Sequence, residues 1–157
     1  RANGFLIPST IMFVTYTGQG HDIDATPDGR HNGDPVADSC GPMQGTDIDG
    51  PTSMLSSTAI LPQTHGLGTM ILNLRVNISM LGSAELRAKL KGLLQSYFAM
   101  GGMQVQITAL DADKLKDALI HPEAHENLIV RIGGYTEYFN RLDDQLKQEV
   151  IKRTAHL

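Results

Sequence analysis

The second half of the chain alternates short apolar segments with longer amphipathic ones, and this alternation limits the fold more than any other feature. The short segments are rich in Ile, Val and Leu, as buried strands are, whereas the longer ones repeat leucines at helical spacing. Strands are expected at 69–76, 103–110 and 128–132, and helices at 83–100, 112–120 and 143–154. Strands that alternate with helices indicate an α/β architecture with at least some parallel pairing.

Polar residues and glycines mark the ends of the first two of these helices. Ser83 and Asp111 stand at N-cap positions, where a side-chain oxygen accepts hydrogen bonds from the first free amides of a helix. Gly101 and Gly102 follow the first helix and are expected to end it. The leucines and aromatic residues between 86 and 98 are interpreted as core, and the last helix is expected to bury its apolar face.

The N-terminal third has a different character. Residues 5–16 combine Ile, Val, Phe and Thr with Pro8 near their start, which predicts a strand. Residues 17–52 are polar and rich in Gly, Asp and Pro, with no helical period. A loop of this length is usually functional or packed against another element. A short helix is expected at 53–61, just before Pro62.

The expected strands are too few for a closed fold. About four strands cannot close a barrel, although they could be its final staves. The chain also starts at Arg1 without Met and runs almost directly into an apolar segment. These features favour a single domain or fragment, spanning 1–157, of a longer protein.

Composition narrows the classes of function. The 157 residues are 41% apolar and 19% charged, with a formal net charge of −4, which gives no reason to expect nucleic acid or an anionic membrane as partner. Cys40 is the single cysteine, so no internal disulfide can form, and a reducing compartment is favoured. No apolar run reaches eighteen residues. A cytoplasmic location is expected.

Gly133 and Gly134 directly follow the strand expected at 128–132. A glycine pair permits a tight turn and lets bare backbone approach whatever faces the end of the strand. On spacing alone, an ordinary turn is the commoner explanation.

The surrounding sequence, however, resembles the C-terminal signature of the glycyl radical enzymes. That signature is Arg, then Val or Ile, a small residue, the radical Gly, and Tyr or Phe. Arg131, Ile132, Gly133, Gly134 and Tyr135 match it in order. Other stretches are similar to family segments in the same order, at 25–30, 34–38, 41–45, 49–52, 103–111 and 149–154.

The resemblance implies a fold and a site. It implies the C-terminal portion of a ten-stranded β/α barrel, incomplete on its own, with a radical loop at about 130–140. The position before the aromatic residue is the family's radical site, so Gly134 is expected to hold the unpaired electron. Arg131, Ile132, Gly133 and Tyr135 would form the rest of the loop motif.

The resemblance also implies partners. A separate iron–sulfur, S-adenosylmethionine-dependent enzyme would install the radical, and no bound cofactor is expected. The catalytic cysteine of the family lies upstream of the matched segments, so Cys40 is interpreted as a small buried or loop residue. The expected partners are an N-terminal part or large subunit that carries that cysteine, the activating enzyme and a small-molecule substrate, within a homo-oligomer.

No metal site is expected either. His121 and His125 are four residues apart, but Pro122 lies between them and the His-Glu-x-x-His order of zinc enzymes is absent. A solvated helix end is the simpler interpretation of this segment.

Two functional alternatives remain beside that of a radical-bearing part of an enzyme. One is a replacement subunit that docks on a damaged radical enzyme, and the other is a structural fragment without radical chemistry. The reaction also stays open, since the family includes lyases, dehydratases, decarboxylases and enzymes that add hydrocarbons to fumarate. Gly133 and the residues after Tyr135 depart from the formate-lyase pattern, which favours the other branches.

Overall fold

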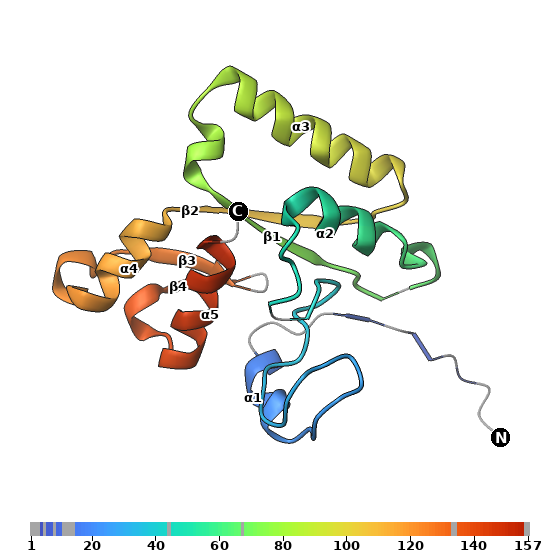
Figure 1. The fold of residues 1–157 in the computed structure, drawn as a ribbon, viewed down its shortest axis with the longest axis horizontal. Helices are drawn as coiled ribbons and strands as arrows, with labels where there is room; N and C mark the ends of the chain where they lie inside the picture. The colour runs from blue at the N-terminus through green and yellow to red at the C-terminus, as the bar shows by residue number, and fades with distance from the viewer. Residues whose placement is uncertain are drawn as a thin grey trace.

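A computed structural model describes residues 4, 6–7, 9–10, 15–43, 45–66, 68–132 and 135–155. Figure 1 shows how the elements follow one another along the chain. The α-helices and strands of the described residues are α1 (Thr15–His21), α2 (Gly50–Ala59), β1 (Leu72–Asn77), α3 (Ala84–Ala99), β2 (Val105–Leu110), α4 (Ala112–Ile120), β3 (Ile129–Ile132), β4 (Tyr135–Tyr138) and α5 (Asp144–Ala155). Short 3₁₀ turns join several of them, including η3 (Pro122–His125) before β3.

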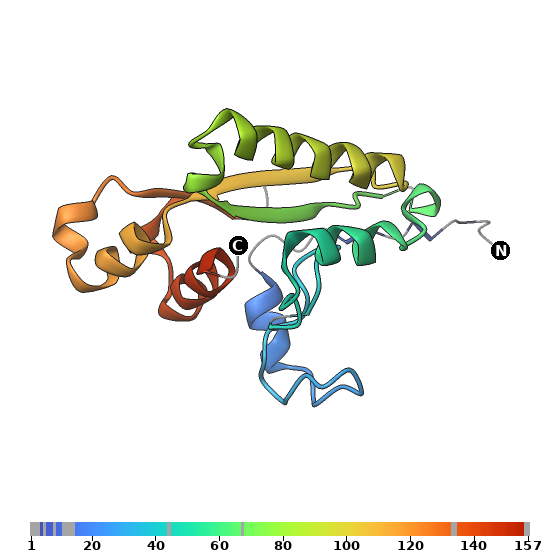
Figure 2. The ribbon, with the colours of Figure 1, turned by 45° about the horizontal axis from the view of Figure 1, so that its top comes forward.

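Strands β1 and β2 pair in parallel, from Leu72 opposite Val105 to Asn77 opposite Leu110. Helix α3 makes the crossover between them and runs along the pair (Figure 2). The predicted α/β architecture with parallel pairing is therefore confirmed. The described residues hold two strand pairs, one parallel and one antiparallel, so the barrel remains a proposal about the longer protein.

The predicted helix caps form as expected. The Ser83 hydroxyl accepts a hydrogen bond from the Leu86 amide at 3.1 Å, and Asp111 Oδ1 accepts from the amides of Asp113 and Lys114, both at 3.1 Å. Gly101 follows α3 with a φ of +103°, a conformation that favours glycine. The helix predicted at 112–120 is α4 to the residue.

Two sequence predictions about burial and strands are wrong. The stripe at 86–98 lies only partly in the core, because Phe98 is 47% exposed. No strand spans 5–16 in the described residues, since Tyr16 and Thr17 belong to α1; residues 5, 8 and 11–14 lie outside the described part. Tyr16 is fully buried against distant residues, and such tertiary contacts override a local preference for strand.

The long loop and one strand also differ from the prediction. The expected loop at 17–52 begins inside α1 and ends inside α2, which starts at Gly50 because Pro51 suits the first turn of a helix. Strand β4 was not predicted. Its sequence, Tyr135–Tyr138, has two polar residues between two tyrosines, and within the described residues it pairs with β3.

The buried apolar residues form two clusters. The first, here called the scaffold cluster, joins β1 with α2 and α3. Its buried members are Met54, Leu55, Ala59, Leu72, Leu74, Val76, Leu90 and Tyr97.

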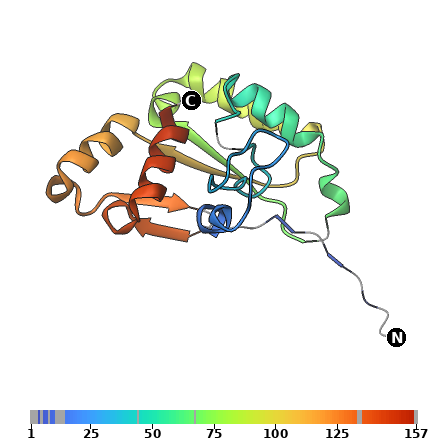
Figure 3. The ribbon, with the colours of Figure 1, turned by 60° about the horizontal axis from the view of Figure 1, so that its bottom comes forward.

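The second, here called the hairpin cluster, surrounds β3 and β4, with α5 lying across them (Figure 3). Its buried members are Tyr16, Leu110, Leu115, Ala118, Val130, Ile132, Phe139, Leu142, Leu146, Val150 and Ile151. The predicted burial of the apolar face of the last helix, at Leu146, Val150 and Ile151, is confirmed.

Candidate functional site

Strands β3 and β4 form an antiparallel hairpin whose last pair is Ile132 opposite Tyr135. Gly133 and Gly134 connect this pair in the sequence and lie outside the described residues. Of the predicted motif, Arg131 and Ile132 therefore end β3 and Tyr135 begins β4. The structure brings these three residues together at one end of a two-stranded ladder.

The two faces of β3 differ sharply in exposure. Val130 and Ile132 are buried, whereas Ile129 and Arg131 are exposed. This alternation is that of a strand with one face on a core and the other facing out. The residue before the glycine pair is thus fixed by packing, and Arg131 lies on the opposite face.

Helices α4 and α5 pack against the buried face of the hairpin. Leu115 of α4 and Val150 of α5 pack in the same cluster as Val130 and Ile132. At the open end, the Phe139 amide donates to the Leu128 carbonyl at 2.8 Å. Phe139 itself is fully buried. The hairpin base is therefore closed by a backbone bond and an aromatic anchor.

An Asp–His cluster lies beside this base. Asp117 Oδ1 is 3.0 Å from His121 Nδ1, and Asp117 Oδ2 is 2.6 Å from His125 Nε2. These hydrogen bonds hold the pKa of Asp117 below its ordinary value, since they favour the carboxylate. The Asn140 amide donates to the Pro122 carbonyl at 2.7 Å, which connects η3 to the end of the hairpin.

The histidines were expected to mark a solvated helix end, and His121 does so. His125 is only 15% exposed at its side chain and ties η3 back to α4. Within the described ranges, no group of three or more His, Cys, Asp and Glu is arranged to hold a metal ion. The signal in the sequence was the four-residue spacing from Asp117 to His121.

Cys40 is buried, as the sequence interpretation proposed. Its thiol lies 2.9 Å from the Thr10 hydroxyl, and its amide donates to the Ile71 carbonyl at 2.9 Å. Burial raises the pKa of the Cys40 thiol, which keeps it protonated. A cysteine that acts as a thiolate nucleophile needs the opposite shift. Burial of the side chain suits a packing role.

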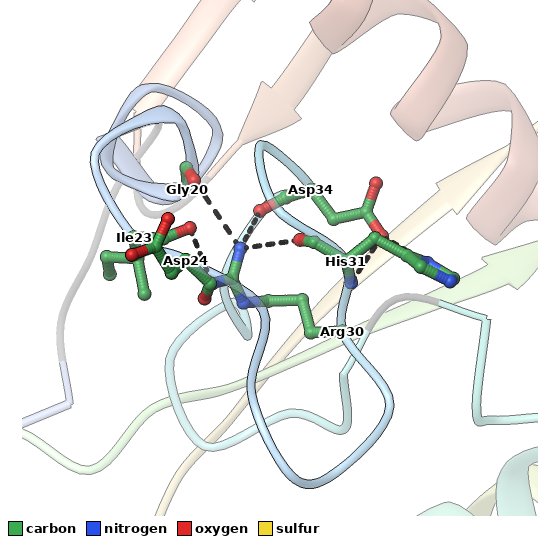
Figure 4. A network of polar contacts seen from close by, with 6 residues as sticks. All are labelled: Gly20, Ile23, Asp24, Arg30, His31 and Asp34. Atoms are coloured by element: carbon green, nitrogen blue, oxygen red, sulfur yellow. Dashed lines mark hydrogen bonds and ion pairs between the residues drawn. The ribbon is translucent and has the colours of Figure 1, made fainter.

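The segment at 25–30 has a role that sequence reasoning did not assign. The Arg30 side chain is 5% exposed and lies inside the loop that follows α1 (Figure 4). It donates to five backbone carbonyls, those of Gly20, Ile23, Asp24, His31 and Asp34. Glycines on either side of Arg30, at 29 and 33, take positive φ angles and were the available signal.

A second buried polar group joins the segment at 34–38 to the sheet. Asp38 and Arg75 are both buried, with Asp38 Oδ2 3.6 Å from the Arg75 guanidinium. Asn73 donates to Asp38 Oδ1 at 2.9 Å. Because Asn73 and Arg75 alternate with the apolar residues of β1, one face of this strand is polar although it is buried.

Comparison with known protein families identifies the family of this chain. A family model described as "Glycine radical" matches residues 36–140, which include the parallel strand pair and the whole hairpin. The chain belongs to the glycyl radical family.

Three relatives illustrate the range of similar proteins. The probable dehydratase YbiW of Escherichia coli is 35% identical over 139 residues, which are 88% of this chain and 17% of that protein. The PFL-like enzyme TdcE of the same organism is 34% identical over 155 residues, 94% of this chain and 20% of that protein. Indoleacetate decarboxylase of Tractidigestivibacter scatoligenes is 32% identical over 156 residues, which are 98% of this chain and 18% of that protein. The chain thus spans about a fifth or less of these relatives' length.

Solved structures agree. The chain matches a Roseburia inulinivorans protein from work on 1,2-propanediol dehydration with a TM-score of 0.81 and 35% identity, over 88% of this chain and 18% of that one. It matches the glycerol-bound form of the B12-independent glycerol dehydratase of Clostridium butyricum with a TM-score of 0.79 and 34% identity. This match covers 89% of this chain and 18% of that one. In the described residues, no helix is long and apolar enough to span a membrane.

Proposed function

We propose that this chain is the radical-bearing C-terminal part of an anaerobic glycyl radical enzyme, and that Gly134 stores the radical. One observation carries the proposal: the family match extends across a hairpin whose last paired residues, Ile132 and Tyr135, flank Gly133 and Gly134 in the sequence. Buried Ile132 fixes one side of this glycine pair against the core.

The chemistry explains the residue type. Installing the radical removes one hydrogen atom from the Gly134 Cα, and the unpaired electron is then shared with the flanking amide nitrogen and carbonyl. No side chain twists this system out of plane. A separate iron–sulfur, S-adenosylmethionine-dependent enzyme takes the hydrogen atom, which requires the loop to leave the core transiently.

In turnover the Gly134 radical takes the hydrogen atom of a cysteine S–H that lies outside this chain. The Gly134 C–H bond forms, the S–H bond breaks, and a thiyl radical is left to attack the substrate. Cys40 is assigned a packing role instead, because its thiol is buried beside the Thr10 hydroxyl. The N-terminal part of the same enzyme would supply the catalytic cysteine.

The size of the relatives supports that partnership, since the chain spans 17% and 20% of the first two. Parallel sheets are normally covered on both faces and extended beyond two strands. Ile107 of β2 is nevertheless 39% exposed. Further staves of a ten-stranded barrel would cover this strand, and the complete enzyme would act as a cytoplasmic homo-oligomer on a small molecule.

The reaction is assigned to the dehydratase or decarboxylase branches, with the hydrocarbon–fumarate-adding branch as the remaining option and formate acetyltransferase disfavoured. The reactions for which YbiW, the indoleacetate enzyme and the glycerol enzyme are named support this assignment. The similar identity to the PFL-like TdcE limits it to the level of a branch.

The decisive experiment is electron paramagnetic resonance on the assembled enzyme after anaerobic activation. A glycyl doublet is expected in the wild type and in the control Gly92→Ala, whose added Cβ meets open space on α3. Gly134→Ala should give no doublet. Absence of the wild-type signal under competent activation, or its persistence in Gly134→Ala, would contradict the proposal.

The alternative is a stand-alone replacement subunit that docks on a radical enzyme damaged at its own glycine. Mixing the chain with an oxygen-cleaved relative separates the two functions. Restored radical signal and turnover in that mixture would favour the replacement subunit over the part-of-enzyme role.

A further inference from the structure

The Arg30 guanidinium lies at the centre of a loop that folds back on itself. Nη1 donates to the Asp34 carbonyl at 2.7 Å and to the His31 carbonyl at 3.1 Å, and Nη2 donates to the Ile23 carbonyl at 2.9 Å. Further bonds run to the carbonyls of Gly20 and Asp24 (Figure 4). A planar fork with several donors can join carbonyls on two sides of a loop, whereas a lysine ammonium cannot span them.

These bonds connect the end of α1, at Gly20, to the returning segment of the loop at Asp34. A Cβ at Gly20 would overlap the Asp34 carbonyl and lie 2.9 Å from Pro35 Cα, so the two backbones are in close contact. Just beyond, the Val36 amide donates to the Tyr16 carbonyl at 3.0 Å. Arg30 therefore sets where α1, and with it Tyr16, lies.

Tyr16 is the point at which this loop reaches the hairpin. It is fully buried in the hairpin cluster, together with Val130 and Ile132. Within the described part of the chain, every other buried member of that cluster lies between 110 and 151. The cluster thus consists of one compact C-terminal unit and a single buried aromatic residue that comes from more than ninety positions away.

Two further features lie between the loop and this unit in the described residues. His21 Nε2 lies 3.3 Å from Gln145 Oε1 in an exposed pair. A cavity of about 330 Å³ is lined by Arg30 and Asp34 of the loop and by Glu149 and Lys152 of α5. Tyr16 is thus the buried apolar contact between the loop and the C-terminal unit, and the partly buried Val36 packs beside it.

We propose that Arg30 and Tyr16 form a latch that holds the β3–β4 hairpin in its docked position and limits how often Gly134 reaches the activating enzyme. Arg30 acts as a positioning residue, through Tyr16. The inference rests on the proposed function, in which the loop must leave the core before the radical is installed. A weaker latch should therefore speed installation, whereas simple loss of folding would slow it.

The test uses the assembled enzyme with Arg30→Gln, with Arg30→Lys and with Tyr16→Ala, which breaks the latch at its other end. Arg87→Gln is the matched control, since Arg87 donates to one carbonyl, that of Leu81 at 2.6 Å, on the exposed side of α3. Hydrogen exchange of the hairpin amides and the growth rate of the glycyl doublet are both measured.

Arg30→Gln and Tyr16→Ala should each raise hairpin exchange about tenfold or more, the effect of losing one or more charged hydrogen bonds or a buried aromatic contact. The doublet should also grow faster than in the wild type and decay sooner. Arg30→Lys should fall between the wild type and Arg30→Gln, and Arg87→Gln should change neither quantity.

Unchanged hairpin exchange in Arg30→Gln and Tyr16→Ala, alongside a normal wild-type doublet, overturns the latch alone. Exchange in α3 that rises as much as in the hairpin also overturns it, because Arg30 would then only support folding. A wild-type enzyme without a doublet overturns the proposed function itself, so the two failures are distinct.

Discussion

The scaffold cluster and the hairpin cluster are built on opposite plans. In the scaffold cluster, two six-residue strands pair in parallel around the long, capped helix α3, and β1 is buried on both faces. In the hairpin cluster, two four-residue strands rest on helices that are their immediate neighbours in sequence. The first plan depends on non-local pairing and the second almost wholly on local contacts.

This difference suits two functions. The parallel pair cannot separate without exposing β1, which is buried on both faces, so it provides a fixed frame. A hairpin that carries its own helices can shift as one unit, with Tyr16 as its main apolar tie to the N-terminal third. The proposed radical site lies on the part of the molecule that can move at lower cost.

The largest expected effects on stability come from truncating one fully buried side chain in each cluster. Phe139→Ala and Leu74→Ala each remove a fully buried side chain, at about 3–5 and 2–5 kcal/mol of unfolding free energy respectively. Phe139→Ala should raise hydrogen exchange in β3, β4 and α5 while α3 stays protected. Leu74→Ala should loosen β1, β2 and α3, and through Leu110 the hairpin cluster as well.

Exchange and denaturant unfolding of both variants measure this asymmetry. If Phe139→Ala releases the α3 amides as fully as the hairpin amides, the two clusters unfold as one cooperative body. The distinction between frame and moving unit would then be wrong.

Local signals explain which elements could be predicted from sequence. Helix α4 was found to the residue because Asp111 caps its start and His121-Pro122 ends it. Strand β4 was missed because its evidence is pairing with β3, which the residues of Tyr135–Tyr138 do not reveal alone. Helix α1 was missed for the same kind of reason, since burial of Tyr16 depends on a cluster formed from 110–151.

The candidate site likewise has features that the sequence predicts and features that it does not. Its motif could be located by resemblance, and the structure places Arg131, Ile132 and Tyr135 at the end of a hairpin. The role of Arg30 could not be predicted, because its five acceptors are backbone carbonyls and carry no side-chain signature. Only the folded loop brings them within reach of one guanidinium.

Removing one N-cap from each cluster should have a smaller effect. Asp111→Ala and Ser83→Ala should each cost about 0.5–2 kcal/mol, because each leaves helix amides without their acceptor. Each substitution removes the side-chain acceptor at the N-cap of one helix, so the two can be compared. Asp111→Ala should loosen α4 and the hairpin above it, whereas Ser83→Ala should affect α3 alone.

Hydrogen exchange again reports the outcome, with Asp111→Asn as control, since asparagine caps about as well as aspartate. Equal loosening of the hairpin by Ser83→Ala would show that the cap of α3 is coupled to the moving unit, which the division into two clusters does not allow.

The smallest expected effect concerns Asp117, and it appears as a pH dependence. The pKa of Asp117 lies below its ordinary value of 3.8 because His125 and His121 hydrogen-bond its carboxylate. A depressed pKa gives stability that is present above pH 3.8 and is lost as pH falls through the folded-state pKa. Asp117→Asn should remove this contribution near neutral pH and flatten the acid side of the stability curve.

Thermal unfolding across acid pH, with exchange of the Leu128 amide, measures the effect. Asp113→Asn is the matched control, because that carboxylate is almost fully exposed and lies 3.9 Å from Lys116. If both variants leave the acid slope unchanged, the Asp–His cluster does not hold η3 against α4. The open end of the hairpin would then depend on Phe139 and the Leu128 carbonyl, and the latch at Tyr16 would carry a larger share of the docking.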